Sequence, residues 1–366
     1  MSGEALARTP LYAEHVALGG KMVPFAGFEM PVQYSQGALK EYHAVREGAA
    51  GLFDISHMGQ VRVAGPEALA FLQYVTTNDV SRLTDGQVQY SALLNEAGTF
   101  IDDITTYRLT DDHFYLCINA ANRHKDVAHL MAQAARFDVR VADESDATTL
   151  LALQGEQAQT MLQPLTDIDL GTIGYYRFAP ARLNGTEAMI SRTGYTGEDG
   201  FELYLPNTAA VDVWRTLLAK GAAPIGLAAR DMLRTEMGYA LYGHEINDAV
   251  TPVEAGLMWI TRLDKGDFIG REAVAARKAE GKRKALVGLK LTERGIPREH
   301  YPVVSGGRVV GEVTSGMYSP LAGAGVALAY VEPALAGEGD LAVDIRGKHV
   351  PAERMKPPFV RSRVKK

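Results

Sequence analysis

Residues 87–119 constrain the fold more than any other stretch of the chain. Apolar and polar residues alternate along QVQYSALL, TFIDDITTYRL and HFYLCIN, and the turn-forming segments NEAG and TDD separate these runs. Short turns between alternating runs are typical of hairpins, in which consecutive strands pair antiparallel. The stretch therefore predicts three antiparallel strands joined by two tight turns.

The two turns also predict how these strands pair. If NEAG closes the first hairpin, Leu94 lies opposite Thr99. The same register places Tyr90 opposite Asp103, and closure of the second hairpin by TDD places Asp103 opposite Asn119. Directly opposed residues share one face of a sheet, with Cβ atoms about 4.5–5.5 Å apart. The register thus predicts one polar row of Tyr90, Asp103 and Asn119.

The neighbouring carboxylate, Asp102, is expected on the opposite face, because side chains alternate along a strand. Asp102 and Asp103 therefore cannot form a catalytic pair on one substrate, and one of them is expected to be structural. A bulge of one residue in either turn would reverse these faces. Two interpretations of the row stay open: a solvated sheet face, or a pocket that recognises a heterocycle with mixed donors and acceptors.

Composition excludes several classes of function. The 366 residues are enough for two or three domains, and a net charge of −6 argues against a basic nucleic-acid-binding surface. One cysteine, Cys117, allows neither an intrachain disulfide nor a cysteine-based metal cage, and no paired-histidine motif is present. No apolar run approaches the ~18 residues of a membrane span, and the N-terminus lacks the pattern of a secretion signal. We expect a cytoplasmic protein without a metal site.

Two further segments carry candidate binding chemistry. The glycine-rich loop TGYTGEDGFELYL leads into a strand and presents Tyr195 and Glu202, either as a stacking face and an acceptor or as parts of an ordinary turn. Arg230 and Arg234 share a face of a predicted helix. They suit either salt bridges with neighbouring acids or a clamp for a carboxylate. Met58 suits an apolar slot or the core.

The last quarter of the chain shows a different organisation. Residues 276–285 contain five basic residues and predict a linker between domains. The alternating stretches after it are typical of a small β-barrel or sandwich. The tail, residues 356–366, is again basic and includes Arg361. It is either a frayed end or a positive rim for an acidic partner.

Taken together, these motifs resemble one family. TPLYAEHVALGGKMVPFAGFEMPVQY, GLFDISHMGQVRVAGPEA, NEAGTFIDDITTYRL, INAANRHKD, SRTGYTGEDGFELYL and GLAARDMLRTEMGYALYGHEI are similar in order and spacing to the T-protein of the glycine cleavage system. This resemblance extends from Thr9 to Val360. It implies an α+β fold: a three-domain cloverleaf with two interleaved N-terminal α/β domains built on antiparallel sheets, and a C-terminal β-barrel. The implied boundaries are 1–275 (with one subdomain centred on about 50–140), the linker 276–285 and the barrel 286–366.

The resemblance also implies an activity. The family transfers the methylene carbon of an aminomethyl group on lipoylated H-protein to tetrahydrofolate, giving 5,10-methylenetetrahydrofolate, ammonia and dihydrolipoyl H-protein. Tetrahydrofolate acts as a cosubstrate, without metal, flavin or pyridoxal phosphate, and neither nucleic acid nor membrane is a partner. The family's catalytic aspartate matches Asp103. Its folate-contacting positions match the following residues: Met58, Tyr90, Asn119, Tyr195, Glu202, Arg230 and, near the C-terminus, Arg361.

The chemistry expected of Asp103 follows from its residue type. An unperturbed aspartate has a pKa near ~3.9, so we expect Asp103 to be ionised at neutral pH. It would accept a hydrogen bond from a folate N–H and stabilise developing positive charge. Two related functions stay as alternatives: a demethylase-type one-carbon acceptor and a folate-binding module without catalysis.

Overall fold

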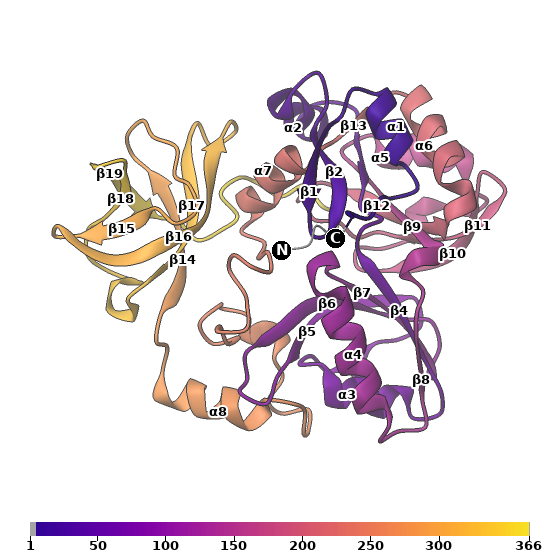
Figure 1. Cartoon of the computed structure of the whole chain (residues 1–366), viewed down its shortest axis with the longest axis horizontal. Helices are drawn as coiled ribbons and strands as arrows, with labels where there is room; N and C mark the ends of the chain where they lie inside the picture. The colour runs from indigo at the N-terminus through magenta and orange to yellow at the C-terminus, as the bar shows by residue number, and fades with distance from the viewer. Residues whose placement is uncertain (1–4, 366) are drawn as a thin grey trace.

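Three large β-sheets organise the chain in the computed structural model, which describes residues 5–365 (Figure 1). The six-stranded sheet has the order β10-β11-β12-β9-β3-β13, the five-stranded sheet the order β5-β6-β7-β4-β8, and a closed barrel the order β14-β17-β16-β15-β18-β19. A hairpin of β1 (Lys21–Phe25) and β2 (Phe28–Gln33) forms a fourth, small sheet. The α+β class and the C-terminal barrel predicted from the sequence are confirmed.

The strands of the five-stranded sheet are β4 (Gly59–Ala64), β5 (Gln87–Leu94), β6 (Phe100–Arg108), β7 (His113–Ile118) and β8 (Arg140–Asp143). Those of the six-stranded sheet are β3 (Gly51–Asp54), β9 (Thr148–Gln154), β10 (Phe178–Leu183), β11 (Thr186–Ser191), β12 (Gly200–Pro206) and β13 (Ala223–Pro224). The barrel contains β14 (Ala285–Leu291), β15 (Pro302–Ser305), β16 (Arg308–Ser319), β17 (Ala324–Val331), β18 (Leu341–Ile345) and β19 (Lys348–Arg354).

Eight α-helices accompany these sheets in the described part of the chain. They are α1 (Tyr12–Ala17), α2 (Ala38–Arg46), α3 (Ala68–Val75), α4 (Arg123–Ala134), α5 (Ala158–Leu162), α6 (Ala210–Ala219), α7 (Leu227–Met237) and α8 (Arg271–Glu280). Figure 1 shows α3 and α4 beside the five-stranded sheet and α7 between the barrel and the six-stranded sheet. Helix α7 is therefore placed where the large sheets approach one another.

The chain crosses between the two N-terminal sheets. It enters the six-stranded sheet with β3, leaves it to build the whole five-stranded sheet from β4 to β8, and returns with β9. Between these sheets lies a shared core, to which Phe53 and Tyr204 contribute from one sheet and Val88, Tyr107 and Tyr115 from the other. Burial of these large aromatic side chains holds the two sheets together. Residues on both sheets are thereby fixed around one central space.

The observed register differs from the predicted one in the first hairpin. The turn is one residue tighter than NEAG requires, since the backbone N–H of Asn95 bonds to the carbonyl of Thr99 at 3.0 Å. A bulge at Ile101 then shifts the pairing by one more residue. Ala92, rather than Tyr90, therefore lies opposite Asp103. The two shifts add up to two residues, which is the repeat of side-chain direction along a strand. Each side chain of this hairpin therefore lies on its predicted face, although its partner across the strands differs from the predicted one.

The segment predicted as a linker, residues 276–285, is partly helical. Residues 276–280 form the last turns of α8, and only residues 281–284 lie outside regular structure before β14 begins. The expected boundary at residue 275 therefore falls inside a helix. The basic residues that suggested a linker are instead spread over a helix end and a short connection.

Candidate functional site

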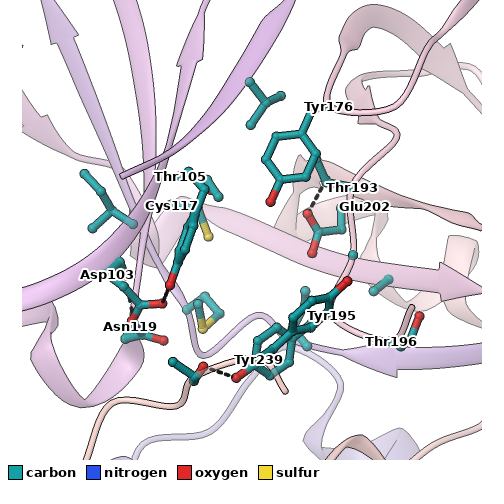
Figure 2. Close-up of a pocket in the computed structure, with 18 of the residues that line it drawn as sticks. Asp103, Thr105, Cys117, Asn119, Tyr176, Thr193, Tyr195, Thr196, Glu202 and Tyr239 are labelled. Atoms are coloured by element: carbon teal, nitrogen blue, oxygen red, sulfur yellow. Dashed lines mark hydrogen bonds between the residues drawn. The ribbon is translucent and has the colours of Figure 1, made fainter. Parts of the chain in front are cut away.

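A cavity of about 610 Å³ lies where the five-stranded sheet, the six-stranded sheet and α7 meet. Its volume is in the range of sites that enclose a small organic ligand. Figure 2 shows Asp103 and Asn119 on one side of this space and Glu202 across from them. The wall includes seven of the eight predicted site residues, namely Met58, Tyr90, Asp103, Asn119, Tyr195, Glu202 and Arg230. Arg361 is not among the lining residues and is exposed.

The carboxyl group of Asp103 is held from two sides. The Tyr90 hydroxyl donates to Oδ2 at 2.8 Å, and Nδ2 of Asn119 donates to Oδ1 at 2.8 Å. Tyr90 reaches Asp103 diagonally across the strand pair, because its direct partner is Thr105. The predicted polar row therefore exists as a hydrogen-bonded set, and it faces a cavity rather than bulk solvent.

The environment of Asp103 corrects the expectation of an ordinary carboxylate. The pKa of Asp103 is raised to about 7, mainly by burial in the cavity wall and in second place by the nearby charge of Asp102. The hydrogen bonds from Tyr90 and Asn119 act in the opposite direction, because they favour the ionised form. Asp103 is thus poised between its protonated and ionised states near neutral pH, which is the range suited to moving a proton.

Asp102 points away from the cavity, as the alternation of side chains predicts. It is fully buried, and its oxygens accept hydrogen bonds from the backbone N–H of Asn119 at 2.8 Å and from Nδ2 of Asn122 at 2.5 Å. Asp102 is not among the residues that line the cavity. The two adjacent carboxylates therefore have separate environments.

Glu202 provides the acid of the opposite wall. It lies on β12, accepts a hydrogen bond from the hydroxyl of Thr193, and has its pKa raised by burial (Figure 2). The next residue, Gly194, leaves no room for a side chain, since a Cβ there would lie 2.0 Å from Oε1 of Gln154. The glycine-rich loop thus passes close to β9 and brings its polar residues to the cavity.

The two arginines of α7 have different environments. Arg234 is fully buried and bonds to Asp231 at 2.7 Å and to Glu245 at 2.9 Å. The guanidinium of Arg230 forms no ion pair among residues 5–365, and it lies over the ring of Tyr195 at 4.7 Å. Burial lowers the pKa of Arg230. The sequence left open whether this pair was structural or a clamp; Arg234 is structural, and Arg230 offers its donors to the cavity.

Several lining residues had no signal in the sequence analysis. Tyr239 stacks at a tilt on Tyr195 with ring centroids 5.5 Å apart, and Trp259, which is 64% exposed, lies 5.8 Å from the ring of Tyr90. Tyr176 lines the cavity with a positive φ of 58°, which is unusual for a bulky residue. Isolated aromatic residues in loops carry no periodic pattern, so only the packing of these loops reveals their role.

Within residues 5–365, no group of three His, Cys, Asp or Glu side chains is arranged to hold a metal ion. Nor does the described chain contain a helix long and apolar enough to cross a membrane. The polar groups that line the cavity are two carboxyl groups, one guanidinium, several amides, hydroxyl groups and the thiol of Cys117.

Comparison with known proteins identifies close similarity over nearly the whole length. Residues 11–265 match the family model described as the GCVT N-terminal domain, and residues 284–361 match the glycine cleavage T-protein C-terminal barrel domain. The chain is 50% identical to an aminomethyltransferase of Thermus thermophilus over 353 residues, covering 96% of this chain and 99% of that protein. It is 48% identical to an aminomethyltransferase of Desulfitobacterium hafniense over 352 residues, covering 95% of this chain and 96% of that protein. The crystal structure of glycine cleavage system aminomethyltransferase T from Bartonella henselae superimposes with a TM-score of 0.93 at 36% identity, covering 99% and 100%.

Proposed function

The chain belongs to the glycine cleavage T-protein family, and on that premise we propose how the cavity carries out the activity of an aminomethyltransferase. The donor is the aminomethyl group carried on the lipoyl arm of H-protein, and the acceptor is tetrahydrofolate. The products are 5,10-methylenetetrahydrofolate, ammonia and dihydrolipoyl H-protein.

In this proposal, tetrahydrofolate occupies the cavity with its pterin between the two sheets. The carboxyl of Glu202 accepts hydrogen bonds from the donor-rich amino edge of the pterin. Arg230, which has no carboxylate partner among residues 5–365, donates to a carbonyl or carboxylate of the ligand. The rings of Tyr195 and Tyr239 supply apolar contact area.

Asp103 acts at the reacting nitrogen. The folate N5 attacks the methylene carbon while the bond from that carbon to the amine breaks, and the amine takes up the N5 proton and leaves as ammonia. N10 then forms the second bond to the same carbon while the carbon–sulfur bond breaks, and the sulfur takes up the N10 proton to give dihydrolipoyl H-protein. When ionised, Asp103 accepts the N–H of the acceptor nitrogen and stabilises positive charge on it. Tyr90 and Asn119 keep the carboxyl group in place, so that little reorganisation is needed during the transfer.

Further parts of the proposal concern the whole chain. We propose that the two N-terminal sheets and the barrel correspond to the three lobes of a cloverleaf, and that the protein acts in the cytoplasm. H-protein presents its lipoyl arm from outside the cavity. A folate contact of Arg361, which is exposed and is not among the lining residues, stays a prediction from the resemblance.

One observation carries the proposal: Asp103, Glu202 and Arg230, which are far apart in the sequence, share the wall of one cavity. The test is ammonia release from aminomethyl-loaded H-protein, measured with and without tetrahydrofolate. We expect Asp103→Asn to lower kcat by about 10²–10⁴, as is typical for loss of a positioned acid or base, while folate binding persists.

The matched control for this variant is Asp146→Asn. Asp146 is exposed, pairs with Arg123 and lies outside the cavity wall, so its loss should leave kcat unchanged. Wild-type turnover in Asp103→Asn would refute the assignment of Asp103. Ammonia release that does not depend on tetrahydrofolate would instead refute the acceptor.

A further inference from the structure

A second carboxyl group lies behind Asp102, on the side remote from the cavity. Asp126 belongs to the first turn of α4 and, like Asp102, is fully buried. The two carboxyl groups lie within hydrogen-bonding reach of each other. Neither oxygen of Asp126 has a hydrogen-bond donor among residues 5–365. A buried carboxylate without any donor would be very unfavourable, so this geometry requires a proton on Asp126.

Asp102, by contrast, is surrounded by donors. It accepts the backbone N–H of Asn119, Nδ2 of Asn119 at 2.9 Å and Nδ2 of Asn122. Burial raises the pKa of Asp102, and these donors act in the opposite direction because they favour its ionised form. The pair therefore holds one proton, placed on Asp126, and one negative charge, placed on Asp102.

Asn119 connects this pair to the cavity. The same Nδ2 that donates to Asp102 also donates to Oδ1 of Asp103 at 2.8 Å. An amide NH₂ has two hydrogens. One is directed to Asp102 and the other to Asp103, whose backbone carbonyl also accepts from Nδ2 at 3.1 Å. The position of Asp102 thereby determines which way the amide of Asn119 faces, and hence whether it can hold Asp103.

We propose that Asp126 is a positioning residue for aminomethyl transfer: as a neutral acid it donates to Asp102, which orients Asn119 and through it the carboxyl group of Asp103. This inference rests on the proposed function, because it takes Asp103 as the group at the reacting nitrogen. Asp126 itself is not among the residues that line the cavity. Its contribution is to complete the hydrogen bonds of a buried charge.

The charges around this set are consistent with a protonated Asp126. Asp103 is faced by Tyr90 from β5, by Tyr195 from the glycine-rich loop, by Asp102 on its own strand and, at longer range, by Asp126 from α4. Lys125 is the cation that acts on Asp126, and its ammonium group is directed to the hydroxyl of Tyr242 at 2.9 Å. Burial, followed by the charge of Asp102, raises the pKa of Asp126 to about 11.

Two substitutions separate a donor role from simple packing. Asp126→Asn keeps a neutral donor of the same shape, and we expect kcat and its pH profile to stay within about twofold of wild type. Asp126→Leu has a similar volume but no donor. We expect it to lower kcat on the order of 10-fold, the effect of one hydrogen bond to a charged group, while KM for tetrahydrofolate stays unchanged. Asp138→Leu, which removes an exposed carboxylate beyond the end of α4, is the control.

Infrared spectroscopy provides a readout that does not depend on turnover. At about pH 9, where Asp103 with its pKa of about 7 is ionised, the wild type should show the carbonyl stretch of a buried protonated carboxyl group, and the difference spectrum against Asp126→Asn should assign this band to Asp126. Asp103→Asn should retain this band, so a failure of the proposed function leaves the buried pair still testable.

Three results would overturn the inference. One is wild-type kcat in a folded Asp126→Leu variant. Another is a loss of kcat in Asp126→Asn as large as in Asp126→Leu, which would mean that a neutral donor is not what matters. The third is the absence of the protonated-carboxyl band from the wild type, a measurement that remains informative even if Asp126→Leu fails to fold.

Discussion

Tyr90 controls the ionisation of Asp103 from the cavity side. Its hydroxyl donates to Oδ2 of Asp103. Burial raises the pKa of Asp103 to about 7, and this hydrogen bond keeps that pKa from rising further. If the reaction requires the carboxylate, kcat/KM falls as pH drops through that pKa. The acid limb of the pH profile is therefore a direct measure of the hydrogen bonds at this residue.

Replacing Tyr90 by Phe should move this limb to higher pH. Loss of the donor removes a contribution that lowers the Asp103 pKa, so the pKa rises, by about one unit for one hydrogen bond to a charged group. The measurement is kcat/KM against pH. Tyr175→Phe, a cavity change without contact to Asp103, should leave the limb in place. A shift to lower pH in Tyr90→Phe would contradict the assignment.

Arg230 is expected to act mainly in binding. Its guanidinium lies beside Tyr195 without an acidic partner among residues 5–365, and a ligand group supplies that partner in our proposal. We expect Arg230→Ala to raise KM for tetrahydrofolate by about tenfold or more and to change kcat much less. Arg230→Lys should recover only part of the loss, because it keeps the charge but not the planar fork. A collapse of kcat at unchanged KM would place Arg230 at the reacting carbon.

At the scale of elements, the end of α7 shows how a backbone requirement shapes the cavity. Gly238 follows the helix in a left-handed conformation with φ 69° and ψ 25°, and a Cβ there would lie 2.3 Å from Cβ of Pro357. The next residue is Tyr239, which enters the cavity wall. Termination of the helix at this glycine therefore both sets the direction of the aromatic residue and lets the C-terminal segment pack close by.

Substitution of Gly238 should lower the free energy of unfolding for two reasons, its positive φ and its contact with Pro357, and Gly243 serves as the comparison that has only the first. Gly243→Ala meets only the backbone penalty of positive φ, since nothing lies within 4 Å of its Cβ, and should cost about 1 kcal/mol of unfolding free energy. Gly238→Ala adds the clash with Pro357 and should cost about 1–3 kcal/mol more. Denaturant unfolding of both variants measures the difference. Equal losses would show that the C-terminal segment moves aside freely.

At the scale of the whole molecule, one buried arginine joins several parts of the chain. Arg46 on α2 bonds to Glu236 of α7 at 2.8 Å and to Glu198 of the glycine-rich loop at 2.8 Å. Glu236 also accepts the hydroxyl of Ser319 from β16, so the barrel is attached to the same set. A single cation thus connects the N-terminal helix region, the wall of the cavity and the barrel.

Arg46→Met should therefore destabilise the protein strongly. The variant leaves the buried Glu236 without its cation and Glu198 with only Arg363, at 3.6 Å. Breaking a buried pair in this way typically costs about 3–5 kcal/mol. The matched control is Arg62→Met, which breaks a partly exposed pair with Glu144 and should cost about 1 kcal/mol or less. Unfolding in urea measures both. A similar small loss in the two variants would show that the buried set adds specificity rather than stability.

Much of the architecture could be predicted from local pattern. Alternation along residues 87–119 indicated three antiparallel strands, and parity along β6 separated Asp102 from Asp103. That separation survived an incorrect register because the two shifts of one residue add up to two. The tighter turn and the bulge at Ile101 could not be predicted, because each depends on how the hairpin packs against neighbouring segments, such as the carbonyl of Val250 that accepts from the backbone N–H of Phe100.

Local sequence pattern was enough to predict the strands of residues 87–119 and the face on which each aspartate lies, and the motifs were enough to identify the family. The packing of distant segments sets the rest: Arg230 has no ion-pair partner among residues 5–365 while Arg234 is buried in ion pairs, Tyr239 and Trp259 join the cavity wall, and the pKa of Asp103 is raised to about 7. The two kinds of feature differ in the sequence distance over which they are set. Side-chain alternation is a property of neighbouring residues, whereas desolvation and charge pairing depend on groups that folding brings together from distant segments.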